Sequence, residues 1–193
     1  DLSALEQAAK IVEPFFDMID YNMGCPAPHI TQQMAGGALL QQSNLTEQIF
    51  KTLVNAVKKP VTLKIRSGVT DASRFLFRDI AEIAEDEGIQ MITFHPRTVH
   101  QGYSGNADWK LIKELKEISN IPIVGNGDIT TPEDAKKMID ETNCDYVMIG
   151  RGAMGNPFLF EQINDYLKNN TYQEYSFKDR LDSFFEYLHL TTK

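Results

Sequence analysis

Five short apolar segments recur along this chain, and each is followed by a stretch with the character of a helix. The segments cover residues 17–22, 61–66, 91–95, 121–124 and 146–149. Their starts are separated by about 43, 30, 30 and 25 residues, which is the spacing of β-strands joined by crossover helices. The pattern therefore predicts a parallel sheet built from βαβ units.

The segments between the strands carry helical periodicity or helix-start signals. Residues 131–133 are Thr-Pro-Glu, which combine a capping hydroxyl, a proline at the first helical position and an early acid. Ser3 and Glu6 have capping-box spacing, and Asn44 precedes an apolar face repeated every four residues. We expect helices over residues 1–13, 44–57, 72–87, 109–118, from 132 onward, 157–168 and 176–190.

Polar or basic side chains follow every predicted strand. A doubly wound sheet binds ligand at one switch point, so only some of its strand ends need chemical groups. In a (β/α)8 TIM-type barrel all strand ends meet at one open end. The sequence therefore favours such a barrel, with about five β/α units present. The residues concerned are Asn22, Cys25, Lys64, Arg66, His95, Arg97, Asn126, Asp128 and Arg151.

Two glycine-containing turns follow the last two strands. They are Gly125-Asn126-Gly127-Asp128 and Gly150-Arg151-Gly152. Glycines let backbone N–H groups approach phosphate oxygens, and loops at this position of a barrel commonly bind phosphate. One such turn alone would be explained by chain reversal. The two together predict a phosphorylated ligand.

Cys25 stands between a glycine and a proline, Gly24 and Pro26, which disfavours burial in a regular element. It has no second cysteine at metal-ligand spacing, so a catalytic thiol is the favoured interpretation. Lys64 interrupts an apolar strand, and a lysine facing a barrel interior requires an anion or polar ligand. The alternative for Lys64 is a solvated outer rim. The role of His95 stays open, and Arg66 and Arg97 are either ligand contacts or surface charges.

Composition limits the class of protein. The net charge of −8 argues against an indiscriminate nucleic-acid binder, and no apolar run approaches the ~20 residues of a membrane span. The two cysteines are far apart, which predicts neither a metal site nor a disulfide framework. We expect a cytoplasmic protein.

Several segments, taken together and in order, resemble the tRNA-dihydrouridine synthases, which are FMN-dependent (β/α) barrels. Any one of the matching segments is weak evidence, but the set is specific and covers about residues 18 to 160. The segments are Asn22-Met23-Gly24-Cys25-Pro26, Val61-Thr62-Leu63-Lys64-Ile65-Arg66, His95-Pro96-Arg97-Thr98, Gln101-Gly102-Tyr103-Ser104-Gly105, Ala107-Asp108-Trp109, Asn126-Gly127-Asp128-Ile129 and Gly150-Arg151-Gly152 with Asn156-Pro157.

The resemblance implies reduction of a tRNA uridine to 5,6-dihydrouridine. Hydride would come from reduced FMN to C6, the proton from Cys25 to C5, and NADPH would reduce the flavin again. Asn22, Arg66 and Arg97 are then expected at the substrate. The expected cofactor contacts are Lys64, His95, Asn126, Gly127, Asp128, Gly150 and Arg151.

The chain also departs from the family pattern. The family's first three strands are absent, and His29 stands where a lysine is frequent. We therefore expect an internal fragment with a partial FMN-binding barrel over 1–160 and the start of a helical tRNA-binding domain over 161–193. The parent protein is expected to be a monomer without metal, and the fragment alone to be inactive. The competing hypotheses are an FMN barrel that reduces a free pyrimidine and a non-catalytic, RNA-binding barrel remnant.

Overall fold

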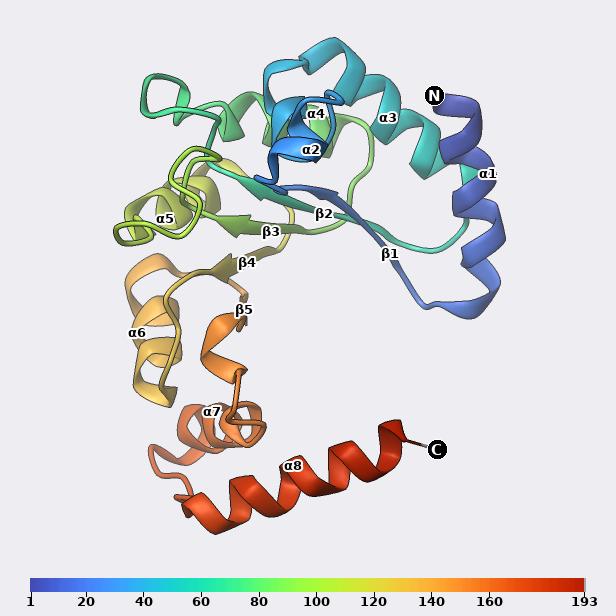
Figure 1. Ribbon diagram of the computed structural model, residues 1–193. Coiled ribbons are helices and arrows are strands. Elements are labelled where there is room, and N and C mark those ends of the chain that lie inside the picture. Colours follow the sequence, from blue (N-terminus) through green and yellow to red (C-terminus); the bar gives the residue numbers. More distant parts are fainter. Residues whose placement is uncertain (193) are drawn as a thin grey trace.

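The computed structural model describes residues 1–192, and its centre is one parallel five-stranded sheet (Figure 1). The strands are β1 (Ile19–Met23), β2 (Val61–Arg66), β3 (Ile92–His95), β4 (Ile123–Asn126) and β5 (Tyr146–Met148). Their spatial order is the order of the chain, with no reversal. A doubly wound sheet would change direction at a switch point. The sequential winding therefore confirms the barrel-type fold.

Helices connect successive strands and lie along one side of the sheet (Figure 1). The helices are α1 (Leu2–Val12), α2 (Pro28–Thr31), α3 (Ser43–Ala56), α4 (Phe77–Asp86), α5 (Trp109–Ile118), α6 (Pro132–Thr142), α7 (Leu159–Asn169) and α8 (Phe177–Thr191). Short 3-10 turns occur at Glu13–Phe15, Gly36–Gln41, Asp71–Ser73 and Arg151–Ala153. Helix α1 packs against α3, and α7 packs against α6.

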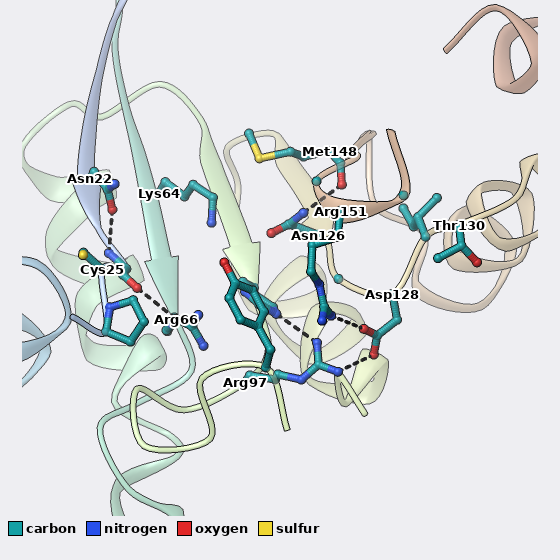
Figure 2. Close-up of a pocket in the computed structure, with 18 residues that line it drawn as sticks. Asn22, Cys25, Lys64, Arg66, Arg97, Asn126, Asp128, Thr130, Met148 and Arg151 are labelled. Atoms are coloured by element: carbon teal, nitrogen blue, oxygen red, sulfur yellow. Dashed lines mark hydrogen bonds and ion pairs between the residues drawn. The ribbon is translucent and has the colours of Figure 1, made fainter. Parts of the chain in front are cut away.

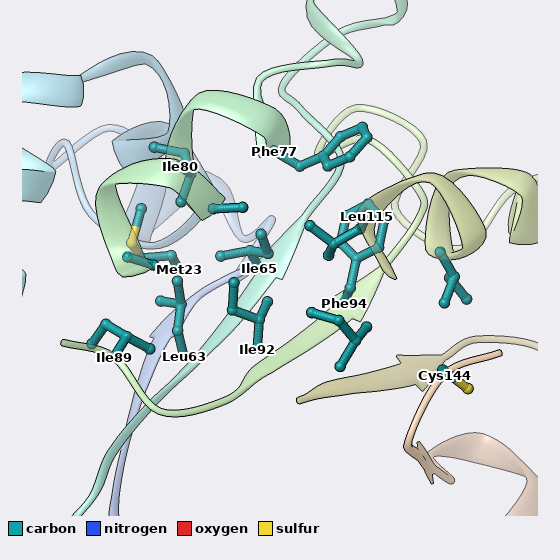
Figure 3. Packing of buried hydrophobic residues seen from close by; sticks show 14 of the residues in the cluster. Met23, Leu63, Ile65, Phe77, Ile80, Ile89, Ile92, Phe94, Leu115 and Cys144 are labelled. Carbon is teal, nitrogen blue, oxygen red and sulfur yellow. The ribbon is translucent and has the colours of Figure 1, made fainter. Parts of the chain in front are cut away.

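The hydrophobic core lies between the sheet and these helices (Figure 3). Ile65 and Phe94 come from strands, Ile80 and Leu115 come from helices, and all four are fully buried. Burying one such side chain contributes about 1.5–3 kcal/mol. Because strand side chains alternate between faces, the residues between these core positions face the opposite side of the sheet.

Those opposite-facing residues form two layers, as the strand register shows. In the lower layer Asn22 is in register with Lys64, and Lys64 with Thr93. In the upper layer Arg66 is in register with His95, and Asn126 with Met148. Parallel strands in register place these side chains beside one another. The fold therefore gathers polar groups from β1 to β4 at the carboxyl ends of the strands.

Two predicted helix caps and one predicted helix start were wrong. Asp1, rather than Ser3, caps α1 through the N–H groups of Ser3 and Ala4. Asn44 lies inside α3, which begins one residue earlier without a side-chain cap. The predicted start at residue 72 is a 3-10 turn over Asp71–Ser73, so α4 begins only at Phe77.

The sheet is open within residues 1–192, because β1 and β5 each pair on one side only. Apolar side chains are exposed next to these strands: Phe15, Phe16 and Met18 precede β1, and Tyr146 lies in β5. These observations agree with the expected exposed barrel edge. Helix α8 also has exposed aromatic residues, and Lys193 of the predicted second domain lies outside the described residues. In the described part of the chain, no helix combines the length and apolarity needed to span a membrane.

Candidate active site

A cavity of about 780 Å³ opens at the carboxyl ends of the strands (Figure 2). All the residues that the sequence singled out for catalysis, substrate or cofactor line it, although they come from segments up to 129 residues apart. They are Asn22, Cys25, Lys64, Arg66, His95, Arg97, Asn126, Gly127, Asp128, Gly150 and Arg151. Lys64 therefore lies on the cavity side rather than on a solvated outer rim.

Asn22 and Cys25 line the cavity from the end of β1. The Asn22 Oδ1 accepts a hydrogen bond from the Gly24 N–H at 2.9 Å, which leaves the two amide hydrogens for a ligand. Cys25 is a free, half-buried thiol, and its carbonyl accepts from the Gly37 N–H at 3.0 Å. A side chain at Gly36 would lie 2.9 Å from the Cys25 Cβ, so glycine allows this loop to pack closely on the cysteine.

Lys64 and Arg66 bring two positive charges to β2. Burial, and secondarily Arg66, lowers the pKa of Lys64 below its ordinary value. Arg66 is buried and donates to three carbonyl oxygens, those of Gly24, Thr98 and Gly102, at 2.8, 3.0 and 2.8 Å. Its guanidinium therefore holds the loop that carries Cys25 against the loop that follows β3.

His95 and Arg97 lie at the end of β3, where positive charge surrounds the imidazole. Burial, followed by Arg66, Lys64 and Arg97, lowers the pKa of His95 to about 3. His95 is therefore neutral at physiological pH and can donate or accept a hydrogen bond. Its Nε2 lies 3.3 Å from Nη1 of Arg97, which is almost completely buried.

The glycine turn after β4 packs closely against the loop after β3 and against the turn after β5, and two glycines make this possible. Gly127 has φ +125°, and a side chain there would lie 2.8 Å from the Ala107 Cβ. A Cβ at Gly152 would lie 2.2 Å from the Ile129 carbonyl oxygen. The Asn126 amide donates to the Met148 carbonyl at 2.8 Å and links the two strand ends. The two turns thus form one wall of the cavity.

Sequence reasoning missed Tyr103, Thr130 and Met148 as lining residues. The Tyr103 ring is 60% exposed, with the Arg151 guanidinium 4.5 Å and the Arg66 guanidinium 5.9 Å from its centre. In the sequence, its position between Gly102 and Gly105 was the available signal that an aromatic residue lies on a tight loop. In the structure both glycines have φ near +60°.

The cavity lining carries an excess of positive charge. Lys64, Arg66, Arg97 and Arg151 contribute four cationic groups, whereas Asp128 is the one carboxylate among the lining residues. Cations at both ends and a glycine wall suit a long ligand with an anionic end. Among residues 1–192, no group of three or more His, Cys, Asp or Glu side chains is placed to hold a metal ion.

Comparison with known proteins gives consistent matches. The family model described as "Dihydrouridine synthase (Dus)" matches residues 1–189. The chain is 46% identical over 167 residues to a probable tRNA-dihydrouridine synthase of Rickettsia bellii, covering 86% of this chain and 51% of that protein. It is also 46% identical over 172 residues to tRNA-dihydrouridine synthase B of Vibrio parahaemolyticus, covering 89% of this chain and 53% of that protein. The chain thus spans about half the length of these curated relatives.

A solved structure supports the fold. The structure of histamine dehydrogenase from Rhizobium sp. 4-9 superimposes with a TM-score of 0.65 at 17% identity, covering 85% of this chain and 28% of that one. At this level of identity the likeness concerns the fold alone.

Proposed function

Because the chain belongs to the dihydrouridine synthase family, we propose that the intact protein reduces specific uridines of tRNA to 5,6-dihydrouridine. By the intact protein we mean this chain with whatever its gene encodes on either side. The observation that carries the proposal is the common cavity. It brings a half-buried thiol, an amide with free donors, a neutral imidazole and four cations to the carboxyl ends of five parallel strands.

The residues present fit FMN. The glycine wall at 126–128 and 150–151 would receive its phosphate, with Arg151 as the exposed cation, while Lys64 and His95 would contact the flavin or its ribityl chain. Burial lowers the pKa of Lys64, which means that its charged form is poorly solvated. A polar or anionic ligand would stabilise that charged form. When bound and reduced, the flavin supplies the hydride for C6 of the uracil, and NADPH is the proposed reductant.

Cys25 is the proposed proton donor to C5. Addition of a hydride to the C5–C6 double bond leaves negative charge that a positioned acid must neutralise. The thiol S–H bond breaks, the C5–H bond forms, and the thiolate regains its proton from solvent. Asn22 lies on the same strand end and is proposed to bind the uracil edge.

Arg66 and Arg97 remain proposed substrate residues. Their guanidinium groups already bind backbone carbonyls, so we propose that they act on the base through positive potential and through the loops that they hold.

The target uridine must unstack from the folded tRNA for its base to reach this cavity. We propose that residues 1–160 form part of the FMN-binding barrel and that 161–193 begin a helical tRNA-binding domain. Helix α7 packs on α6, whereas α8 leaves Phe184 and Phe185 exposed. We further propose that the protein acts as a monomer in the cytoplasm.

The test is Cys25→Ala in the intact protein, with Cys144→Ala as the matched control. Cys144 is the second free cysteine but is buried away from the cavity. Dihydrouridine in tRNA is measured by mass spectrometry in cells lacking the gene and complemented with each variant. Cys25→Ala should abolish dihydrouridine yet preserve tRNA binding in a gel-shift assay, whereas Cys144→Ala should retain product.

Normal product from Cys25→Ala would eliminate the acid role. Activity on free uracil with none on tRNA would favour a free-pyrimidine reductase, and tRNA binding without any product from wild type would favour an RNA-binding module.

The 193-residue chain by itself should bind FMN poorly and turn over nothing, because within residues 1–192 the sheet is open at β1 and β5. Flavin absorbance of the purified chain measures this. Stoichiometric, tightly held FMN would contradict the expectation.

A further inference from the structure

Asp128 is the one carboxylate among the residues that line the cavity, and its backbone is held in the left-handed region with φ 58°. Aspartate and asparagine tolerate this conformation better than most residues other than glycine. The turn directs the carboxylate toward two arginines from other strand ends, Arg97 and Arg151 (Figure 2). A carboxylate in this position would repel a phosphate, so the expected cofactor contact at 126–128 explains the backbone there but not the Asp128 side chain.

The contact with Arg97 is tight and enclosed. The Asp128 Oδ2 accepts from Arg97 Nη2 at 2.8 Å and from the Ala107 N–H at 2.7 Å. Arg97 is 1% exposed and also donates to the carbonyls of Ser104 and Gly105, at 3.2 and 2.6 Å. Asp128 and Arg97 together therefore fix the segment 104–107, which directly follows Tyr103.

The contact with Arg151 is weaker and open. The Asp128 Oδ1 lies 3.3 Å from Arg151 Nη2, and the Arg151 side chain is 51% exposed. Its guanidinium also lies over the Tyr103 ring. Arg151 can leave this contact at little cost, whereas the buried guanidinium of Arg97 would be left without partners if it moved away from its acceptors.

We propose that Asp128 is a positioning residue that gives the two arginines different roles. It fixes Arg97 in a position where Arg97 stabilises the loop after β3. It also binds Arg151 weakly, so that Arg151 can move to the anionic end of the ligand when the ligand binds. The second half of this inference rests on the proposed flavin cofactor, but the first half does not.

The test uses Asp128→Asn in the intact protein. Asparagine keeps the size and tolerates the left-handed backbone, so the change removes the negative charge and one of the two acceptor oxygens. The control is Asp145→Asn, because Asp145 also accepts hydrogen bonds from a cation and a backbone N–H, those of Lys116 and Ile123, but lies directly before β5 and does not line the cavity. Two readouts are made: hydrogen exchange of the peptide 98–109, and the dissociation constants of FMN and riboflavin, which differ by the phosphate.

Asp128→Asn should accelerate exchange of the peptide 98–109 by about tenfold, and Asp145→Asn should leave it unchanged. The affinity ratio of FMN over riboflavin should rise about threefold to tenfold, because a negative charge is lost and Arg151 is released. Arg151→Gln should lower that ratio, and Asp128→Asn should raise it less in the double variant than in wild type, because no Arg151 is left to be released. Unchanged exchange, or a ratio that falls in Asp128→Asn, would overturn the inference. If wild type bound neither flavin, the proposed function would fail instead, and the exchange result would still decide the role of Asp128 in the loop.

Discussion

The buried histidine at the end of β3 gives a sharp prediction for the pH dependence of stability. His95 is 6% exposed and faces Lys64, Arg66 and Arg97, with Asp128 as the acidic group opposing them. The folded protein holds its pKa at about 3, whereas an unfolded histidine titrates near 6.5. Between these values the unfolded state binds more protons than the folded state. Stability must therefore fall as the pH is lowered from 6.5 toward 3.

The size of the effect follows from the linkage relation. Between pH 7 and pH 4.5 the protonation of His95 in the unfolded state removes about 2.5 kcal/mol from the free energy of unfolding. His95→Asn keeps a hydrogen-bond acceptor for Arg97 but cannot titrate. Its free energy of unfolding should therefore fall by about 2.5 kcal/mol less than that of wild type over the same pH interval.

Urea unfolding of the cofactor-free intact protein at the two pH values measures this difference. His100→Asn is the matched control, because His100 is exposed in the next loop and does not line the cavity. Equal losses in wild type and His95→Asn would refute the reasoning. So would a His95 imidazole resonance that titrates near pH 6.5 by NMR.

Two further predictions concern stability. Gly152→Ala should lower the free energy of unfolding by about 2–3 kcal/mol because its Cβ would meet the Ile129 carbonyl at 2.2 Å; Gly24→Ala, with its nearest contact at 3.6 Å, should stay within about 1 kcal/mol of wild type. Similar losses in both would contradict the packing argument. Ser67→Ala should stay within about 0.5 kcal/mol of wild type or exceed it, because Ser67 Oγ is buried and has no hydrogen-bond partner among residues 1–192. Thr142→Ala should lower the free energy of unfolding by about 1 kcal/mol, because the hydrogen bond from its hydroxyl to the Met138 carbonyl is lost. Chemical denaturation measures both variants, and equal stability of Ser67→Ala and Thr142→Ala would contradict this reasoning.

Local signals in the sequence predicted much of the fold. Strand β2 was predicted over 61–66 and lies there, because its apolar run is bounded by Pro60 and a polar loop. Helix α6 starts at Pro132, with Thr131 and Asp134 forming a capping box. Where a cap could come from more than one nearby polar residue, as with Asp1 and Ser3, the sequence did not decide between them.

The sequence predicted which residues belong to the candidate site, but not the hydrogen bonds that these residues make. Strand-end position alone placed Arg66, Arg97 and Asp128 at the cavity, because every parallel strand ends on the same side of the sheet. Apart from His95 beside Arg97, their partners are 7 to 42 residues away in the chain, mostly in loops whose path depends on tertiary packing. The enclosed bonds of Arg97 and the loose contact of Arg151 are therefore visible only in three dimensions.

The two ends of the cavity belong to the two outermost strands of the sheet. Cys25 follows β1 and Arg151 follows β5, four inter-strand steps or about 19 Å apart along the sheet. The separation across the cavity is thus governed by sheet curvature, not by the length of any side chain. Replacements beneath the middle strand, at Phe94 for example, would alter the distance between thiol and phosphate end without touching either group.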